Sequence, residues 1–204
     1  VVFQPTGRGT AAGVLFGLLP VLAGDPDGVV VLTPSDHGVR NAGVFRAGIL
    51  EANAHAQSPG GSGLFGVEPS APRTDYGWIT LRPERGWTMI QPVASFVEKP
   101  DAQTATQLLS EGAIWNTMVI VARVQELLDL CRVQLPDVTA MFEQALTLPR
   151  EKRHAFIAAR YPSLAVADFS RDVVTPARDL FAYTWSASMG WSDLGTPERL
   201  DPWV

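Results

Sequence analysis

The hydrophobic pattern of the chain alternates between short apolar runs and longer segments with helical spacing. Residues 29–32, Val-Val-Val-Leu, form a run that is too short for a helix and that predicts a strand buried on both faces. Pro34 ends this strand, which leaves Asp36 on a loop at the carboxyl end of a central strand. Ligands of open α/β sheets bind at that edge, although the position also suits a turn residue or the N-cap of the next helix.

The rest of the pattern predicts strands and helices in alternation. We expect strands at residues 64–67, 76–81, 93–97, 114–121 and 180–186. We expect helices at residues 11–22, 41–57, 102–110, 124–135, 137–148 and 151–160. This alternation indicates an α/β fold, with the last three helices forming a helical insertion at about residues 124–160.

Composition narrows the class of protein. The 204 residues are 46% hydrophobic and 18% charged, which is typical of a globular domain, and a net charge of −5 without a basic run argues against a nucleic-acid partner. Cys131 is the sole cysteine, so we expect neither a disulfide framework nor a cysteine zinc site, as fits a cytoplasmic protein. Neither a membrane helix nor a signal peptide is predicted. Because the chain begins at Val1 rather than Met, we expect it to be a fragment.

Three stretches carry candidate chemistry. The loop at residues 4–10 is rich in glycine and leads into a helix for which Thr10 is the expected N-cap. Such an arrangement is suited to binding an anion. The same glycines, with Asp36 further on, also resemble a dinucleotide-binding fingerprint, although Pro5 interrupts the passage from strand to loop. Gly77 inside a strand indicates either a close approach of a ligand or a bulge, and Glu98 and Lys99 follow each other at a strand end, where their side chains should diverge.

Taken together, five segments resemble the sugar-nucleotide pyrophosphorylases, and most closely the mannose-1-phosphate guanylyltransferases. In chain order they are Gln4-Pro5-x-x-Arg8-Gly9-Thr10, Pro34-Ser35-Asp36-His37, Tyr76-Gly77-Trp78-Ile79, Phe96-Val97-Glu98-Lys99-Pro100 and Gly190-Trp191-Ser192-Asp193-Leu194-Gly195. Trp115-Asn116 and Asp168-Phe169-Ser170 add to the match. Each motif is weak alone, but their order and spacing extend over nearly the whole chain.

The resemblance implies a Rossmann-like nucleotidyltransferase fold, a mixed and mostly parallel sheet flanked by helices, that occupies residues 1–204 as a partial domain. It also implies the transfer of a guanylyl group from GTP to mannose 1-phosphate, which gives GDP-mannose and pyrophosphate. Such a reaction needs alignment and charge neutralisation more than covalent catalysis.

The resemblance also assigns roles to single residues. Asp36 and Asp193 would hold Mg²⁺, and Lys99 would bind the sugar phosphate. The sugar hydroxyls would be bound by Gly77, Glu98 and Asn116, and the nucleotide would be lined by Pro5, Arg8, Gly9 and Thr10. A homodimer is compatible with the family.

Several positions depart from the family pattern. Gly9 stands where the family usually has Asn, and Thr117-Met118 replaces the Ser-Gly that commonly follows Trp-Asn. The family's N-terminal glycine-rich phosphate loop is absent, so we expect this chain alone to be inactive. Two alternatives stay open: a related nucleotidyltransferase for another sugar or base, and a non-catalytic homologue that binds a sugar nucleotide and regulates a partner.

Overall fold

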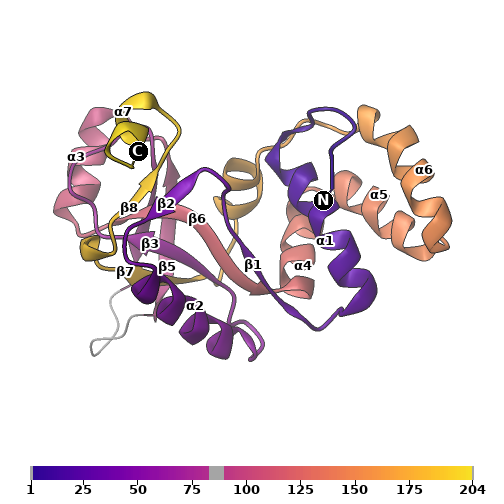
Figure 1. Cartoon of the computed structure of the whole chain (residues 1–204), viewed down its shortest axis with the longest axis horizontal. Coiled ribbons are helices and arrows are strands. Elements are labelled where there is room, and N and C mark those ends of the chain that lie inside the picture. The colour runs from indigo at the N-terminus through magenta and orange to yellow at the C-terminus, as the bar shows by residue number, and fades with distance from the viewer. Residues whose placement is uncertain (1, 83–89, 204) are drawn as a thin grey trace. The chain divides into compact units, whose positions relative to one another are not determined.

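The computed structural model describes residues 2–82 and 90–203 (Figure 1). The chain divides into two compact units. The helical unit comprises Val1–Gly28 and Arg123–Ala177, and the sheet unit comprises Val29–Ala122 and Arg178–Val204. Each unit therefore combines segments that are far apart in the sequence.

A six-stranded sheet forms the centre of the sheet unit. Its strand order is β1 (Val29–Leu32), β6 (Ile114–Arg123), β3 (Gly63–Val67), β7 (Phe181–Trp185), β5 (Ile90–Glu98) and β4 (Gly77–Leu81), and β6 also pairs with β4. A second sheet consists of β2 (His37–Val39) and β8 (Trp191–Asp193). The strands expected from the apolar runs all form.

The sheet is mixed and belongs to an α/β fold, as predicted, but the expectation of a mostly parallel sheet is wrong for the strands whose registers are described. Strand β3 runs parallel to β7, whereas the β3–β6, β4–β5, β4–β6 and β5–β7 pairs are antiparallel. The reason is that β4 and β5, which are consecutive in the chain, pair with each other as antiparallel strands, and that β6 is antiparallel to both β3 and β4. Alternating helices and strands in a sequence do not report such reversals.

Strand β1 is neither central nor buried on both faces, which corrects a second expectation. It lies at one end of the described sheet, and Val31 in its middle is 42% exposed. An apolar run predicts a buried strand only when sheet neighbours and helices cover it.

The core of the sheet unit is aromatic. The ring of Phe65 stacks on Trp185 at 3.9 Å and on Tyr183 at 4.9 Å between centroids. Helix α2 (Ala42–Ala56) contacts this stack through Gly48, because a side chain at that position would meet the indole of Trp185. The described part of the unit also contains the helical segments α3 (Ala102–Ser110), η3 (Ala187–Met189), α7 (Pro197–Leu200) and η4 (Asp201–Trp203).

The helical unit is built from α1 (Gly9–Gly24), α4 (Val124–Gln134), α5 (Pro136–Thr147) and α6 (Arg150–Arg160), followed by η1 (Tyr161–Ser163) and η2 (Ser170–Val174). Phe16, Phe142 and Tyr161 form a ring cluster in its interior, with centroids 5.7 to 6.2 Å apart. Across the described parts of the chain, no helix combines the length and the apolarity that crossing a bilayer would require.

The first turn of α1 differs from the expectation. Arg8, not Thr10, occupies the N-cap position, and Thr10 lies inside the first turn. Its hydroxyl instead accepts a hydrogen bond from the backbone N–H of Phe169 at 2.7 Å. A long-range partner therefore replaces the local cap that the sequence pattern favours.

We predict that Cys131 in α4 is unreactive in the folded protein. Its side chain is fully buried, and burial raises the pKa of the thiol to about 12. The thiolate is the reactive form, so only roughly one molecule in ten thousand would carry it at pH 8. A disulfide-exchange reagent should therefore label the native chain slowly and the chain in guanidinium chloride at once. Rapid labelling of the native chain would contradict the buried position of Cys131.

Candidate functional site

The pairing of β2 with β8 brings Asp36 and Asp193 together. In this antiparallel pair His37 lies opposite Asp193, and the backbone carbonyl of Asp36 accepts a hydrogen bond from the N–H of Leu194 at 2.8 Å. Asp36 occupies the turn before β2, and Asp193 is the last residue of β8. Two carboxylates from distant parts of the sequence thus project from adjacent backbone.

The two carboxylates have different surroundings. The Asp36 side chain is 66% exposed, and its Oδ1 lies 4.0 Å from Nε2 of His37. The Asp193 side chain is 21% exposed, and its Oδ1 accepts hydrogen bonds from Arg199 and from the N–H of Gly195, the latter at 3.2 Å. Burial lowers the pKa of His37 and thereby favours the neutral imidazole, although the carboxylates of Asp36 and Asp193 act in the opposite direction.

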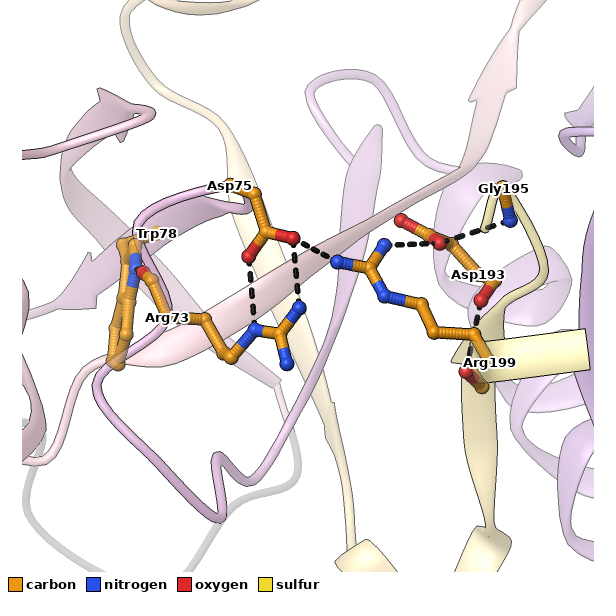
Figure 2. A network of polar contacts seen from close by, with 7 residues as sticks. Arg73, Asp75, Trp78, Asp193, Gly195 and Arg199 are labelled. Carbon is orange, nitrogen blue, oxygen red and sulfur yellow. Dashed lines mark hydrogen bonds and ion pairs between the residues drawn. The ribbon is translucent and has the colours of Figure 1, made fainter. Parts of the chain in front are cut away.

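Arg199 connects Asp193 to a second carboxylate (Figure 2). One guanidinium nitrogen contacts Asp193 and another contacts Asp75, which in turn receives two hydrogen bonds from Arg73 at 2.8 and 2.9 Å. The guanidinium carbon of Arg199 lies 4.8 Å from the centre of the Tyr76 ring. The result is an alternating chain of two cations and two anions beside the predicted sugar-binding strand.

Gly77, Glu98 and Asn116 come together at one end of three neighbouring strands. Gly77 at the start of β4 lies opposite Glu98 at the end of β5. Trp78 lies opposite Trp115 in the β4–β6 pair, so continuing that antiparallel register by one residue places Asn116 level with Gly77. The residues that the resemblance assigns to the sugar are therefore neighbours.

A side chain at Gly77 would crowd two side chains of β5. A Cβ there would lie 2.8 Å from Cζ of Phe96 and 2.9 Å from Oε2 of Glu98. Such contacts are too short for carbon, so the glycine permits the close approach of the Glu98 carboxylate. The groups that approach Gly77 are thus side chains of β5, and the register irregularity of the β4–β5 pair lies at Thr80 and Leu81 rather than at Gly77.

Asn116 is held by its own strand. Its side chain is buried, its Oδ1 accepts from the N–H of Met118 at 3.1 Å, and its Nδ2 contacts the Met118 sulfur at 2.8 Å. Met118 has a φ of +58°, a left-handed conformation that glycine adopts without strain. The position where the family commonly has Gly thus keeps a glycine-like backbone here.

Lys99 and Glu98 converge rather than diverge, which corrects the expectation from their sequence positions. Lys99 has a φ of +46°, so the chain leaves the regular strand geometry immediately after β5. Nζ of Lys99 lies 4.0 Å from Oε1 of Glu98, and the lysine side chain remains 67% exposed. An exposed cation consequently lies beside the cluster of Gly77, Glu98 and Asn116.

The residues expected to line the nucleotide belong to the helical unit. The Arg8 guanidinium donates to the carbonyl of Pro162, and a Cβ on Gly9, whose φ is +82°, would collide with the carbonyl of Ala167. Thr10 donates to Asp168 at 3.2 Å. Pro5 is exposed in the same loop. The loop at residues 4–10 is therefore tied to the segment at 162–169.

The donor atoms of the acidic pair suit a hard divalent cation. Within residues 2–82 and 90–203, no group of three or more His, Cys, Asp or Glu side chains forms a metal cage. Mg²⁺, however, is usually bound through one or two carboxylates together with water and substrate phosphates. Asp36 and Asp193 fit that mode of binding.

Comparison with known proteins identifies the family. The model of the nucleotidyl transferase family matches residues 1–201. The chain belongs to the nucleotidyl transferase family.

Named members of this family cover almost the whole chain. Xanthan biosynthesis protein XanB of Xanthomonas campestris is 29% identical over 206 residues, and mannose-1-phosphate guanylyltransferase of Escherichia coli is 27% identical over 203 residues. The alignments cover 96% of this chain but only 41% and 42% of those proteins, so the chain spans about two fifths of their length.

Solved structures agree with the assignment. The crystal structure titled mannose-1-phosphate geranyltransferase from Thermus thermophilus is 25% identical, with a TM-score of 0.86 over 98% of this chain and 56% of that one. UDP-glucose pyrophosphorylase from Acinetobacter baumanii, at 13% identity and a TM-score of 0.56, shares the fold. The expected nucleotidyltransferase-like α/β fold and family are confirmed.

The sequence patterns did not predict any role for Arg73, Asp75 or Arg199. The two ionic contacts of Arg199 depend on how loop 73–76 and helix α7 approach each other in three dimensions. The available signal was weak: an arginine on the short helix that follows Asp193.

We predict that Gly77→Ala destabilises the protein, because the added methyl group would overlap Phe96 and Glu98. Overpacking of this kind costs about 1–3 kcal/mol in the free energy of unfolding. Urea unfolding followed by tryptophan fluorescence measures it. Gly17→Ala is the control, since a side chain there meets nothing within 4 Å, and alanine in the helix should be neutral or stabilising by about 1 kcal/mol. Equal stability of Gly77→Ala and the wild type would contradict the packing described.

Proposed function

We propose that the protein containing this chain transfers a guanylyl group from GTP to mannose 1-phosphate, giving GDP-mannose and pyrophosphate. The observation that carries the proposal is the juxtaposition of Asp36 and Asp193 in the same unit that gathers Gly77, Glu98 and Asn116. The relatives named mannose-1-phosphate guanylyltransferase support the choice of sugar and base.

The reaction is a displacement at phosphorus. An oxygen of the sugar 1-phosphate forms a bond to the α-phosphorus of GTP, and the bond from that phosphorus to the bridging oxygen of the β-phosphate breaks. The attacking phosphate is already anionic, so no side chain has to remove a proton. The protein therefore needs to bring two polyanions together and hold them in line.

Asp36 and Asp193 would hold Mg²⁺, which when bound would neutralise phosphate charge. Lys99, exposed beside Glu98, would pair with the phosphate of the sugar. Glu98 would accept hydrogen bonds from sugar hydroxyls, and the absent side chain of Gly77 leaves room for the ring to approach the strand. Asn116 would contribute its amide, in exchange for its contacts with Met118.

The nucleotide would be lined by the loop at residues 4–10. Its ties to the segment at 162–169 fix the Arg8 and Thr10 side chains, which are more useful for recognition when already ordered. We further propose that this chain alone turns over slowly or not at all, since it lacks a glycine-rich phosphate loop of the kind that supplies most of the stabilisation in phosphoryl transfer.

The test of the sugar site is Lys99→Ala. We expect it to weaken the binding of mannose 1-phosphate by at least about tenfold, because the substitution removes the cation that faces the phosphate. GTP binding should change by less than about twofold. Isothermal titration calorimetry with each ligand measures both. Lys152→Ala is the matched control, since Lys152 is the other lysine of the chain and lies exposed on α6.

A loss of GTP affinity with unchanged affinity for the sugar phosphate would refute the role of Lys99. Titration of glucose 1-phosphate in parallel tests the choice of sugar, because a mannose site should discriminate against it. For the chain alone, release of pyrophosphate from GTP in the presence of Mg²⁺ and mannose 1-phosphate is expected to stay far below the usual enzyme range of about 1–10³ per second. Turnover within that range would show that the loop is dispensable.

A further inference from the structure

Arg199 is placed between the acidic pair and a separate carboxylate. It contacts Asp193 with one terminal nitrogen and Asp75 with the other, as Figure 2 shows. Its side chain is only 15% exposed, far less than that of Asp75 at 44%. A guanidinium that is this enclosed and held at both ends is not a mobile surface charge.

The position of Arg199 is fixed independently of Asp193. Its guanidinium lies over the Tyr76 ring, and Asp75 is itself held by the two hydrogen bonds from Arg73. Tyr76 in turn contacts Trp115 at 5.0 Å and Trp191 at 5.4 Å between ring centroids. If Asp193 bound another ligand, Arg199 would therefore still be held by Asp75 and would keep its position over the Tyr76 ring.

The two donors to the Asp193 side chain use the same oxygen. Arg199 and the N–H of Gly195 both bond Oδ1, and within residues 2–82 and 90–203 Oδ2 accepts no hydrogen bond. The carboxylate is thus oriented by one oxygen while the other stays available as a ligand. This arrangement positions Asp193 for a cation without occupying both of its oxygens.

Although Arg199 positions Asp193 for a cation, its positive charge weakens the binding of a bare cation. A guanidinium bonded to Asp193 repels a doubly charged ion at the same carboxylate, and in a partly buried site that repulsion is weakly screened. A cation that arrives with a phosphate presents negative charge as well, which Arg199 attracts. Arg199 therefore has two effects on the affinity for a bare ion. By orienting Asp193 it saves only the rotational entropy of one short side chain, whereas its full positive charge repels the ion. The repulsion should be the larger effect.

We propose that Arg199 is a positioning residue that holds Oδ1 of Asp193 and makes the acidic pair accept a divalent cation together with a phosphate rather than the bare ion. This inference rests on the proposed cation-binding role of Asp36 and Asp193. It adds a residue that sets the order in which the components of the site can bind.

The test is the binding of Mn²⁺ alone to the 204-residue chain, followed by the loss of the electron paramagnetic resonance signal of the free ion. Arg199→Gln should bind Mn²⁺ at least about tenfold more tightly than the wild type, because a neighbouring positive charge has been removed. Arg199→Met should show the same gain and keeps an unbranched stem to cover Tyr76, so it replaces Arg199→Gln if that variant does not fold. Thermal unfolding verifies that each variant is folded.

Arg73→Gln is the matched control, because Arg73 bonds Asp75 but does not contact Asp193. It removes the same charge from the same cluster and should change the affinity for Mn²⁺ by less than about threefold. Adding Asp193→Asn to Arg199→Gln should abolish the binding of Mn²⁺. If it does not, Mn²⁺ binds elsewhere, and the proposed cation site fails together with this inference. If it does, but Arg199→Gln binds Mn²⁺ no more tightly than the wild type or than Arg73→Gln, only the role of Arg199 is refuted.

Discussion

The antiparallel pairing of β2 with β8 is the interaction on which the candidate site depends. Each strand has only three residues, so the ladder alone is too short to be stable. Contacts on both sides extend it: the N–H groups of Arg40 and Asn41 donate to the carbonyls of Gly190 and Met189, and the His37 ring meets Trp191 edge to face at 5.2 Å. Gly190 supports the turn into β8 with a φ of +65°, a conformation that costs glycine little. This small sheet converts two distant acidic residues into one pair.

Tyr76 joins that pair to the end of the larger sheet. Its ring lies between the indoles of Trp115 and Trp191, and it immediately precedes Gly77 at the start of β4. Burial is the main reason why the pKa of Tyr76 is raised, with the Asp193 carboxylate adding to the effect. A buried ring thus contacts both β6, the strand of Asn116, and β8, the strand of Asp193.

The features of this fold that depend on residues close together in the sequence could be predicted from the sequence. The β-branched run at 29–32 forms β1, and the helices expected at 41–57 and 102–110 form as α2 and α3, whose N-caps are Asn41 and Asp101. The family motifs also identified residues that prove to be neighbours, Asp36 with Asp193 and Gly77 with Glu98. The features that could not be predicted depend on contacts between residues that are far apart in the sequence or on unusual backbone conformations. The exposure of Val31 depends on which strands cover β1, the hydroxyl of Thr10 bonds Phe169 rather than its own helix, and the left-handed backbone of Lys99 turns it toward Glu98. Periodicity describes one element at a time, whereas these features arise between elements.

The long sequence separation of β8 from β2 has a consequence for how the acidic pair is assembled during synthesis. Synthesis proceeds from the N-terminus, and domains fold as their segments become available. A ribosome that has translated the chain as far as β7 carries Asp36 but not yet the strand that completes the pair. Closing so long a loop is also an entropic cost that only the finished unit can offset. The nascent chain therefore cannot assemble the acidic pair early, and Arg199, encoded shortly after Asp193, emerges almost together with the carboxylate that it holds. The site and its counter-charge are completed in the same step of translation, after β7.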